Sequence, residues 1–173
     1  MNFLTIDYLK TGTPKQIKAF EVLTNNQILL KMEVFHPILV GTIPIDIDIE
    51  NSDLDIICHW ENKQDFIDAV LLHFGSEKDF SFREAFIDGE ESVVAHFVKD
   101  GFEIEFFGQN IPSEHQNGYK HMLVEYEILK AKGEGFRQEI IKLKEEGYKT
   151  EPAFCKLLGL AGNPYQELLK YSI

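Results

Sequence analysis

Two closely spaced pairs of aspartates lie in one short stretch of the chain, and either pair could hold a metal ion. The stretch PIDIDIENSDLDII contains Asp46 and Asp48, followed by Asp53 and Asp55. Carboxylates two residues apart on a strand point to the same face, where they repel each other unless a cation lies between them. Mg²⁺ takes oxygen ligands of this kind and shares them with substrate phosphates. The sequence therefore indicates a metal site with two possible positions.

The residues around each pair distinguish these positions. From Ile43 to Glu50, isoleucines alternate with polar residues, which is typical of a half-buried edge strand whose acidic face is solvated. Asp53 and Asp55 are instead followed by the apolar run IIC, which predicts a core strand. Because burial penalises an ionised carboxylate, carboxylates at the head of a core strand call for a cation. We therefore predict that Asp53 and Asp55 bind the metal.

A glycine and a hydroxyl residue end the preceding apolar segment. Gly41 and Thr42 follow the run PILV. A glycine lets the backbone approach a phosphate closely, and a neighbouring amide and hydroxyl can donate hydrogen bonds to its oxygens. Together with an acidic pair that binds Mg²⁺, this arrangement suits a nucleotide triphosphate.

These motifs resemble the signature of the polymerase-beta-type nucleotidyltransferase superfamily, in which a Gly-Ser pair is followed about a dozen positions later by Asp-x-Asp. Here Gly41-Thr42 precedes the run SDLD, with Ser52 just before the acidic pair and Asp53 twelve positions after the glycine. Thr42 departs from the usual serine but keeps the hydroxyl. The resemblance implies a triphosphate site at Gly41, Thr42 and Ser52, next to the metal-binding aspartates.

The chain resembles more closely a family of small bacterial proteins of unknown function within that superfamily. This resemblance runs nearly end to end and includes PILVGTIPI, SDLDIIC, EIEFFGQ, YKHMLVEYEIL, KTEPAFCKLLGL and GNPYQELL. It implies a nucleotidyltransferase-like fold, but it names no substrate.

The superfamily pattern also implies a third carboxylate on a later strand. The run GFEIEFFG offers Glu103 and Glu105 on one face. An antiparallel partner would bring its C-terminal end to the acidic pair, which favours Glu105; both glutamates could instead be the solvated face of an edge strand. Lys120 and His121, near the start of a long helix, could face the triphosphate, although a histidine beside Met and Leu is more often a packing residue.

The remaining histidines show no ligand spacing such as HxxxH, so no zinc site is predicted from His36, His59, His73, His96 and His115.

Local signals predict the elements that position these residues. A capping box at Thr13 opens a helical region, Asn62 and Gly75 bound a crossover helix, and Asp100-Gly101 marks a hairpin. Ser113 with Gln116 suggests a second capping box before a helical tail. The order predicts an α+β fold: a nucleotidyltransferase-like mixed β-sheet with flanking helices, residues 1–112, and a C-terminal helical segment, residues 113–173, packed on it as one compact unit.

The net charge and the composition limit the classes of function that are expected. The formal net charge of −12 counts against a nucleic-acid polymer as ligand, although a metal ion could still screen a nucleotide. Cys58 and Cys155 are expected to be buried thiols of a cytoplasmic protein. No signal peptide or membrane-spanning run is expected, so no membrane partner is predicted.

The function that these observations favour is Mg²⁺- or Mn²⁺-dependent transfer of a nucleoside monophosphate from an NTP to a hydroxyl of a small molecule or protein. Asp53, Asp55 and Glu105 would be the catalytic and metal-binding residues. Two alternatives stay open: a non-catalytic nucleotide-binding or protein-interaction module that keeps the fold, with a protein partner or as a homodimer, and a metal-dependent phosphohydrolase.

Overall fold

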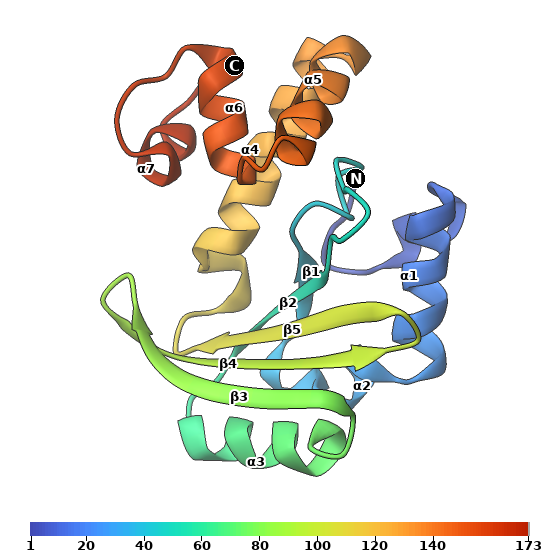
Figure 1. Ribbon diagram of the computed structural model, residues 1–173. Coiled ribbons are helices and arrows are strands. Elements are labelled where there is room, and N and C mark those ends of the chain that lie inside the picture. The colour runs from blue at the N-terminus through green and yellow to red at the C-terminus, as the bar shows by residue number, and fades with distance from the viewer. Residues whose placement is uncertain (173) are drawn as a thin grey trace.

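The computed structural model describes residues 1–172, whose centre is a five-stranded mixed sheet with helices against both faces (Figure 1). The sheet order is β1-β2-β5-β4-β3. All neighbouring strands are antiparallel except β2 and β5, which are parallel. The strands are β1 (Ile38–Val40), β2 (Leu54–His59), β3 (Lys78–Ile87), β4 (Glu90–Lys99) and β5 (Phe102–Gln109). The predicted α+β architecture is confirmed.

Helices precede, interrupt and follow the sheet, as predicted. No helix among residues 1–172 has both the length and the apolar character needed to cross a membrane. The longer helices are α1 (Pro14–Asn25), α3 (Lys63–Phe74), α4 (Asn117–Lys132), α5 (Glu134–Glu145), α6 (Thr150–Leu158) and α7 (Pro164–Leu169). The short ones are η1 (Asp7–Thr11), α2 (Ile28–Lys31), η2 (Glu33–Phe35) and η3 (Ser113–His115).

Most local start and stop signals have the predicted effect. The side chain of Thr13 accepts a hydrogen bond from the Gln16 amide, and the Gln16 side chain accepts one from the Thr13 amide, which completes a capping box. Asn62 caps α3 through the Gln64 amide. Asp100 and Gly101, both with positive φ, form the turn between β4 and β5.

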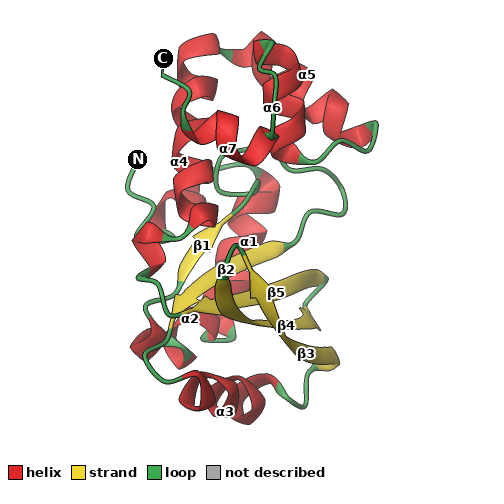
Figure 2. Cartoon of the chain, turned by 90° about the vertical axis from the view of Figure 1, so that its left-hand side faces the viewer, coloured by secondary structure: helices red, strands yellow, loops and turns green. Residues whose placement is uncertain are grey.

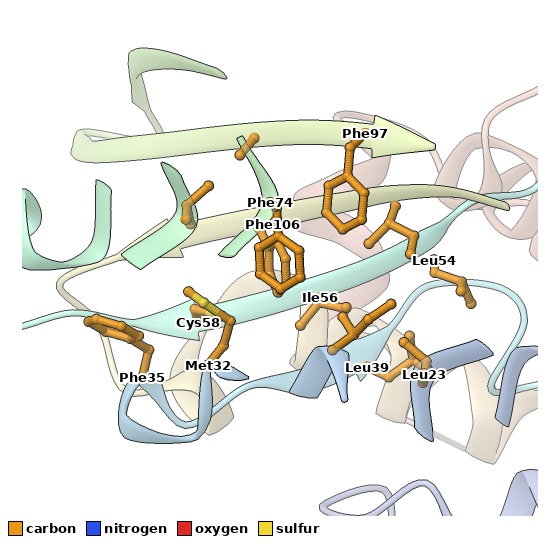
Figure 3. Close-up of a cluster of buried hydrophobic side chains, with 14 of the residues drawn as sticks. Leu23, Met32, Phe35, Leu39, Leu54, Ile56, Cys58, Phe74, Phe97 and Phe106 are labelled. Carbon is orange, nitrogen blue, oxygen red and sulfur yellow. The ribbon is translucent and has the colours of Figure 1, made fainter. Parts of the chain in front are cut away.

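Alternation along the central strands divides the molecule into two cores. Leu54, Ile56 and Cys58 of β2 point to one face of the sheet, together with Phe106 of β5 and Phe97 of β4 (Figure 3). On this face they pack against α1, α2 and α3. Both cysteines are buried free thiols, as predicted.

The opposite face carries the functional candidates and a second core. Figures 1 and 2 show α4 to α7 gathered on one side of the sheet and α3 on the other. Ile57 of β2 and Val40 of β1 pack here against Met122 of α4 and, beyond it, Phe154 of α6. Asp55 alternates with the buried Leu54 and Ile56 on β2, so it faces this helical side. The division of the chain at residue 112 stays a prediction.

The prediction of an edge strand from Ile43 to Glu50 is wrong. Residues 41–53 form a loop of turns, which we call the acidic loop. Ile43, Ile45 and Ile47 are buried as expected and Ile49 is half-buried, but Asp46 has a φ of 58°, which breaks extended backbone. Asp46 and Asp48 also have cationic neighbours, at 3.8 Å from Arg137 and 3.4 Å from Lys15.

The capping box predicted at Ser113 and Gln116 is also wrong. The Ser113 hydroxyl donates to the His36 carbonyl at 2.6 Å, and the Gln116 side-chain amide donates to the Cys58 carbonyl at 2.8 Å. These side chains connect the start of α4 to segments far away in the sequence. The two side chains that suggested a local helix cap therefore make long-range hydrogen bonds instead. A local sequence pattern cannot reveal such distant partners.

Candidate functional site

A cavity of about 450 Å³ lies between the helical side of the sheet and helices α4 and α6. Pockets of this size suit a small molecule or nucleotide. Six carboxylate residues line it, and no lysine or arginine of residues 1–172 does. The acidic lining residues are Asp55, Asp88, Glu90, Glu105, Glu125 and Glu151. The cavity therefore favours cations.

Asp55 and Glu105 lie directly beside each other in this cavity. They are register partners on the parallel strands β2 and β5, so both side chains point to the same face about 5 Å apart at the backbone. The predicted antiparallel pairing of these strands is wrong. In-register parallel pairing nevertheless brings Glu105 to the acidic pair, because it is the partner of Asp55 itself. Glu103 is mostly exposed and lies 3.5 Å from His96, outside the cavity.

The charges of the three predicted ligands act on one another. Burial, together with the charges of Asp53 and Glu105, raises the pKa of Asp55 from 3.8 to about 8. Burial and the charge of Asp53 also raise the pKa of Glu105, while Arg83 and His96 lower it. Asp53 does not line the cavity; it ends the acidic loop one residue before β2. Without a cation, the charge of Asp53 opposes the ionisation of both Asp55 and Glu105, so a hard oxygen-binding cation fits the set.

Gly41 is required by the position of Asp55. Its φ is 84°, and a Cβ at this residue would lie 2.3 Å from the Asp55 carboxylate oxygen Oδ2. Any other residue would therefore combine a strained backbone with a clash against a predicted metal ligand. Gly41 and Thr42 both line the cavity, and their predicted contact with a triphosphate stays a prediction.

Ser52 organises the acidic loop. Its hydroxyl accepts a hydrogen bond from the Ile49 amide at 2.9 Å and one from the Thr42 hydroxyl at 3.3 Å. Ser52 itself does not line the cavity. The structure therefore gives it a supporting contact with Thr42, and its predicted contact with a triphosphate stays a prediction.

Cationic side chains from two helices hold the acidic loop by its carbonyl groups. Lys15 of α1 donates to the Ile49 carbonyl, Arg137 of α5 to the Asp46 carbonyl at 2.8 Å, and Lys144 of α5 to the Ile47 carbonyl at 2.6 Å. Lys144 is buried, which lowers its pKa to about 8, although Asp48, Glu125 and Asp53 partly oppose that shift. The sequence did not distinguish Lys144, because it is one of several lysines in a helical segment rich in charged residues.

Two neighbouring residues predicted to face a triphosphate have different environments. Lys120 is exposed and does not line the cavity. His121 is buried, lines the cavity and lies with its ring edge-on to Tyr165, at 6.2 Å between ring centroids. Burial lowers the pKa of His121, which favours the neutral imidazole.

Two further glutamates, which sequence reasoning missed, accompany His121. Glu125 lies one helical turn further along α4, and Glu151 lies in the first turn of α6. One potential ligand atom from each of the three residues lies within 4.8 Å of the others. The spacing His121-x-x-x-Glu125 was the available signal, since residues four apart share a helix face.

The solved structures that resemble this chain are nucleotidyltransferases. The Cid1 poly(U) polymerase with MgGTP bound matches with a TM-score of 0.54 at 12% identity, over 76% of this chain and 42% of that one. The polymerase core of TRAMP, an RNA surveillance complex, matches with a TM-score of 0.54 at 14% identity, over 94% and 50%. The GLD-2/RNP-8 complex gives a TM-score of 0.54 at 14% identity, over 88% and 60%.

At these identities the likeness establishes the fold and nothing finer. The chain spans about half the length of these structures. No curated protein matches its sequence.

One family model matches residues 21–171, which is most of the chain and includes the acidic loop, the sheet and helices α4 to α7. The model describes a domain of unknown function, and the predicted resemblance to a family of small bacterial proteins stays a prediction. The chain therefore belongs to the family described as "Domain of unknown function (DUF4269)", and its fold is that of the nucleotidyltransferases.

Proposed function

We propose that this protein transfers a nucleoside monophosphate from an NTP to an acceptor hydroxyl, with Mg²⁺ or Mn²⁺ as the cofactor. The observation that carries the proposal is the in-register pairing of Asp55 with Glu105 beside Asp53, with Gly41 leaving room for the Asp55 carboxylate. Asp55 and Glu105 lie side by side in an acidic cavity, with Asp53 close to them at the end of the acidic loop. Such a set has little use without a cation, and Mg²⁺ prefers carboxylate ligands.

In the proposed reaction, the acceptor oxygen forms a bond to the α-phosphorus of the NTP, and the bond from that phosphorus to the pyrophosphate oxygen breaks. Asp53 and Asp55 hold the metal, which neutralises phosphate charge when bound. Glu105 either accepts the proton of the acceptor hydroxyl or completes the metal shell. The backbone at Gly41 and the hydroxyl of Thr42 orient the phosphates.

The acceptor that fits this cavity best is a small molecule, and one that carries amino groups fits better still. Six carboxylate residues line the cavity without a lysine or arginine, and the whole chain has a net charge of −12. A nucleic-acid backbone normally needs a basic surface. Because the similar structures include a poly(U) polymerase and an RNA surveillance polymerase, an RNA acceptor belongs in the test.

The test is pyrophosphate release by the full chain with Mg²⁺ and each of the four NTPs. The acceptors are a panel of hydroxyl compounds with and without amino groups, the protein itself, and an RNA oligonucleotide. We expect pyrophosphate with a small acceptor, and none from the Asp55→Asn variant. Extension of the RNA would overturn the acceptor class but keep the reaction.

Calorimetric titration with ATP and GTP, in Mg²⁺ and in EDTA, provides a second readout. We expect binding only with the metal, since an acidic cavity repels a bare triphosphate. Equal affinity in EDTA, or release of phosphate in place of pyrophosphate, would contradict the proposal.

A further inference from the structure

A second group of potential ligands lies on the helical wall of the cavity, apart from the two strands that carry Asp55 and Glu105. It consists of His121 and Glu125 on α4 and Glu151 on α6, with one potential ligand atom of each within 4.8 Å of the others. All three residues line the cavity. Two helices that are separate in the sequence therefore bring an imidazole and two carboxylates close together.

Burial makes this arrangement costly without a ligand. His121 is 6% exposed and Glu125 is 3% exposed. Within residues 1–172, the buried Nδ1 atom of His121 has no hydrogen-bond partner. A buried polar group that lacks a partner destabilises a fold, so natural structures usually satisfy it with protein, water or an ion.

Neighbouring residues contact or influence the three side chains without forming hydrogen bonds to their ligand atoms. The Tyr165 ring packs edge-on against His121, and Glu151 lies at the start of α6, where the helix dipole favours its charge. Lys144 acts on Glu125 through its charge, but its ammonium donates to the Ile47 carbonyl at 2.6 Å. Among the described residues, no side-chain hydrogen bond therefore joins His121, Glu125 and Glu151 to one another.

We propose that His121, Glu125 and Glu151 form a second metal site, which binds a divalent transition-metal ion such as Zn²⁺. An imidazole ligand favours such ions over Mg²⁺, which prefers oxygen ligands alone. One nitrogen and two carboxylates are the ligand types of three-residue zinc sites, which leave a further coordination position open. Since all three residues line the cavity, that position would face it. This site does not depend on nucleotidyl transfer at the strands.

The test uses the full chain, stripped with EDTA and titrated with Co²⁺ by visible absorption and with Zn²⁺ by calorimetry. We expect Co²⁺ bands that Zn²⁺ abolishes by competition. Loss of an outer-shell partner alone typically weakens metal binding by about 10- to 100-fold, so His121→Asn and Glu125→Gln, which each remove a ligand, should weaken Zn²⁺ binding by at least about 100-fold. The matched control is Glu127→Gln, an exposed glutamate on the same helix, which should bind Zn²⁺ as the parent does.

Asp55→Asn separates the second site from the site on the strands. If the proposal is correct, this variant keeps the Co²⁺ bands while it loses Mg²⁺-dependent nucleotide binding. Loss of the Co²⁺ bands in Asp55→Asn and their retention in Glu125→Gln would assign the ion to the strands and overturn the proposal. Absence of Co²⁺ and Zn²⁺ binding by the folded parent would overturn it as well. Melting curves show whether each variant is folded, and His121→Asn decides the outcome if Glu125→Gln is not.

Discussion

Neutralising Asp55 should stabilise the metal-free protein increasingly as the pH rises. Its pKa is raised from 3.8 to about 8 by burial and by the neighbouring charges of Asp53 and Glu105. A carboxyl group with a raised pKa in the folded state contributes stability that is fully present below its unfolded pKa. That contribution is lost as the pH rises towards the folded pKa. The Asp55→Asn variant has no such loss, so its stability relative to the parent should increase between about pH 4 and about pH 8.

The magnitude follows from the size of the shift. About four pKa units correspond to an upper limit of about 5 kcal/mol in the free energy of unfolding. Asp55 borders a cavity that solvent enters, and water screens part of this cost. We therefore expect the stability difference between variant and parent to grow by about 2 kcal/mol from about pH 5 to about pH 8.

Urea unfolding in EDTA at several pH values measures this difference. Glu103→Gln is the matched control, because it removes an exposed carboxylate from the same sheet, and its stability difference should stay within about 0.5 kcal/mol. Added Mg²⁺ should stabilise the parent but not Asp55→Asn, because Mg²⁺ prefers the oxygen ligands at the strands and only the parent keeps that full set. Stability differences for Asp55→Asn that do not change with pH would refute the electrostatic reasoning.

Three further substitutions test the site. Glu105→Gln should lower turnover by about 10²- to 10⁴-fold in a pyrophosphate assay, whereas Glu103→Gln should not; the reverse result would contradict the register argument. Gly41→Ala should abolish Mg²⁺-dependent nucleotide binding, because its Cβ would lie 2.3 Å from a predicted ligand oxygen. Gly89→Ala, with a similar φ of 89° and open space around it, should cost only about 1 kcal/mol and leave calorimetric binding intact. Lys144→Met should reduce the free energy of unfolding in urea by about 1–3 kcal/mol, because a carbonyl of the acidic loop loses its donor; an unchanged value would contradict this role.

Local chemistry made much of the fold predictable. The Thr13 capping box, the Asn62 cap and the Asp100-Gly101 turn depend on residues within a few positions of each other, and each appears as predicted. The apolar run after Asp55 likewise predicted a core strand, because alternation and burial can be read along one segment. The spacing between Gly41 and the acidic pair also lies within one short segment, so the candidate site could be proposed from the sequence.

The sequence alone therefore determined which segments could form helices and strands, and which acidic pair precedes a core strand. It could not determine the direction of β5 beside β2, because a strand carries no local signal for a partner about fifty positions away. Only the tertiary structure decided that the alternating segment from Ile43 becomes a loop, since the donors to its carbonyls come from α1 and α5. The meeting of His121 and Glu125 with Glu151 has the same origin: α6 packs against α5 and α7, which both pack against α4, and this arrangement brings together ligands that the chain keeps apart.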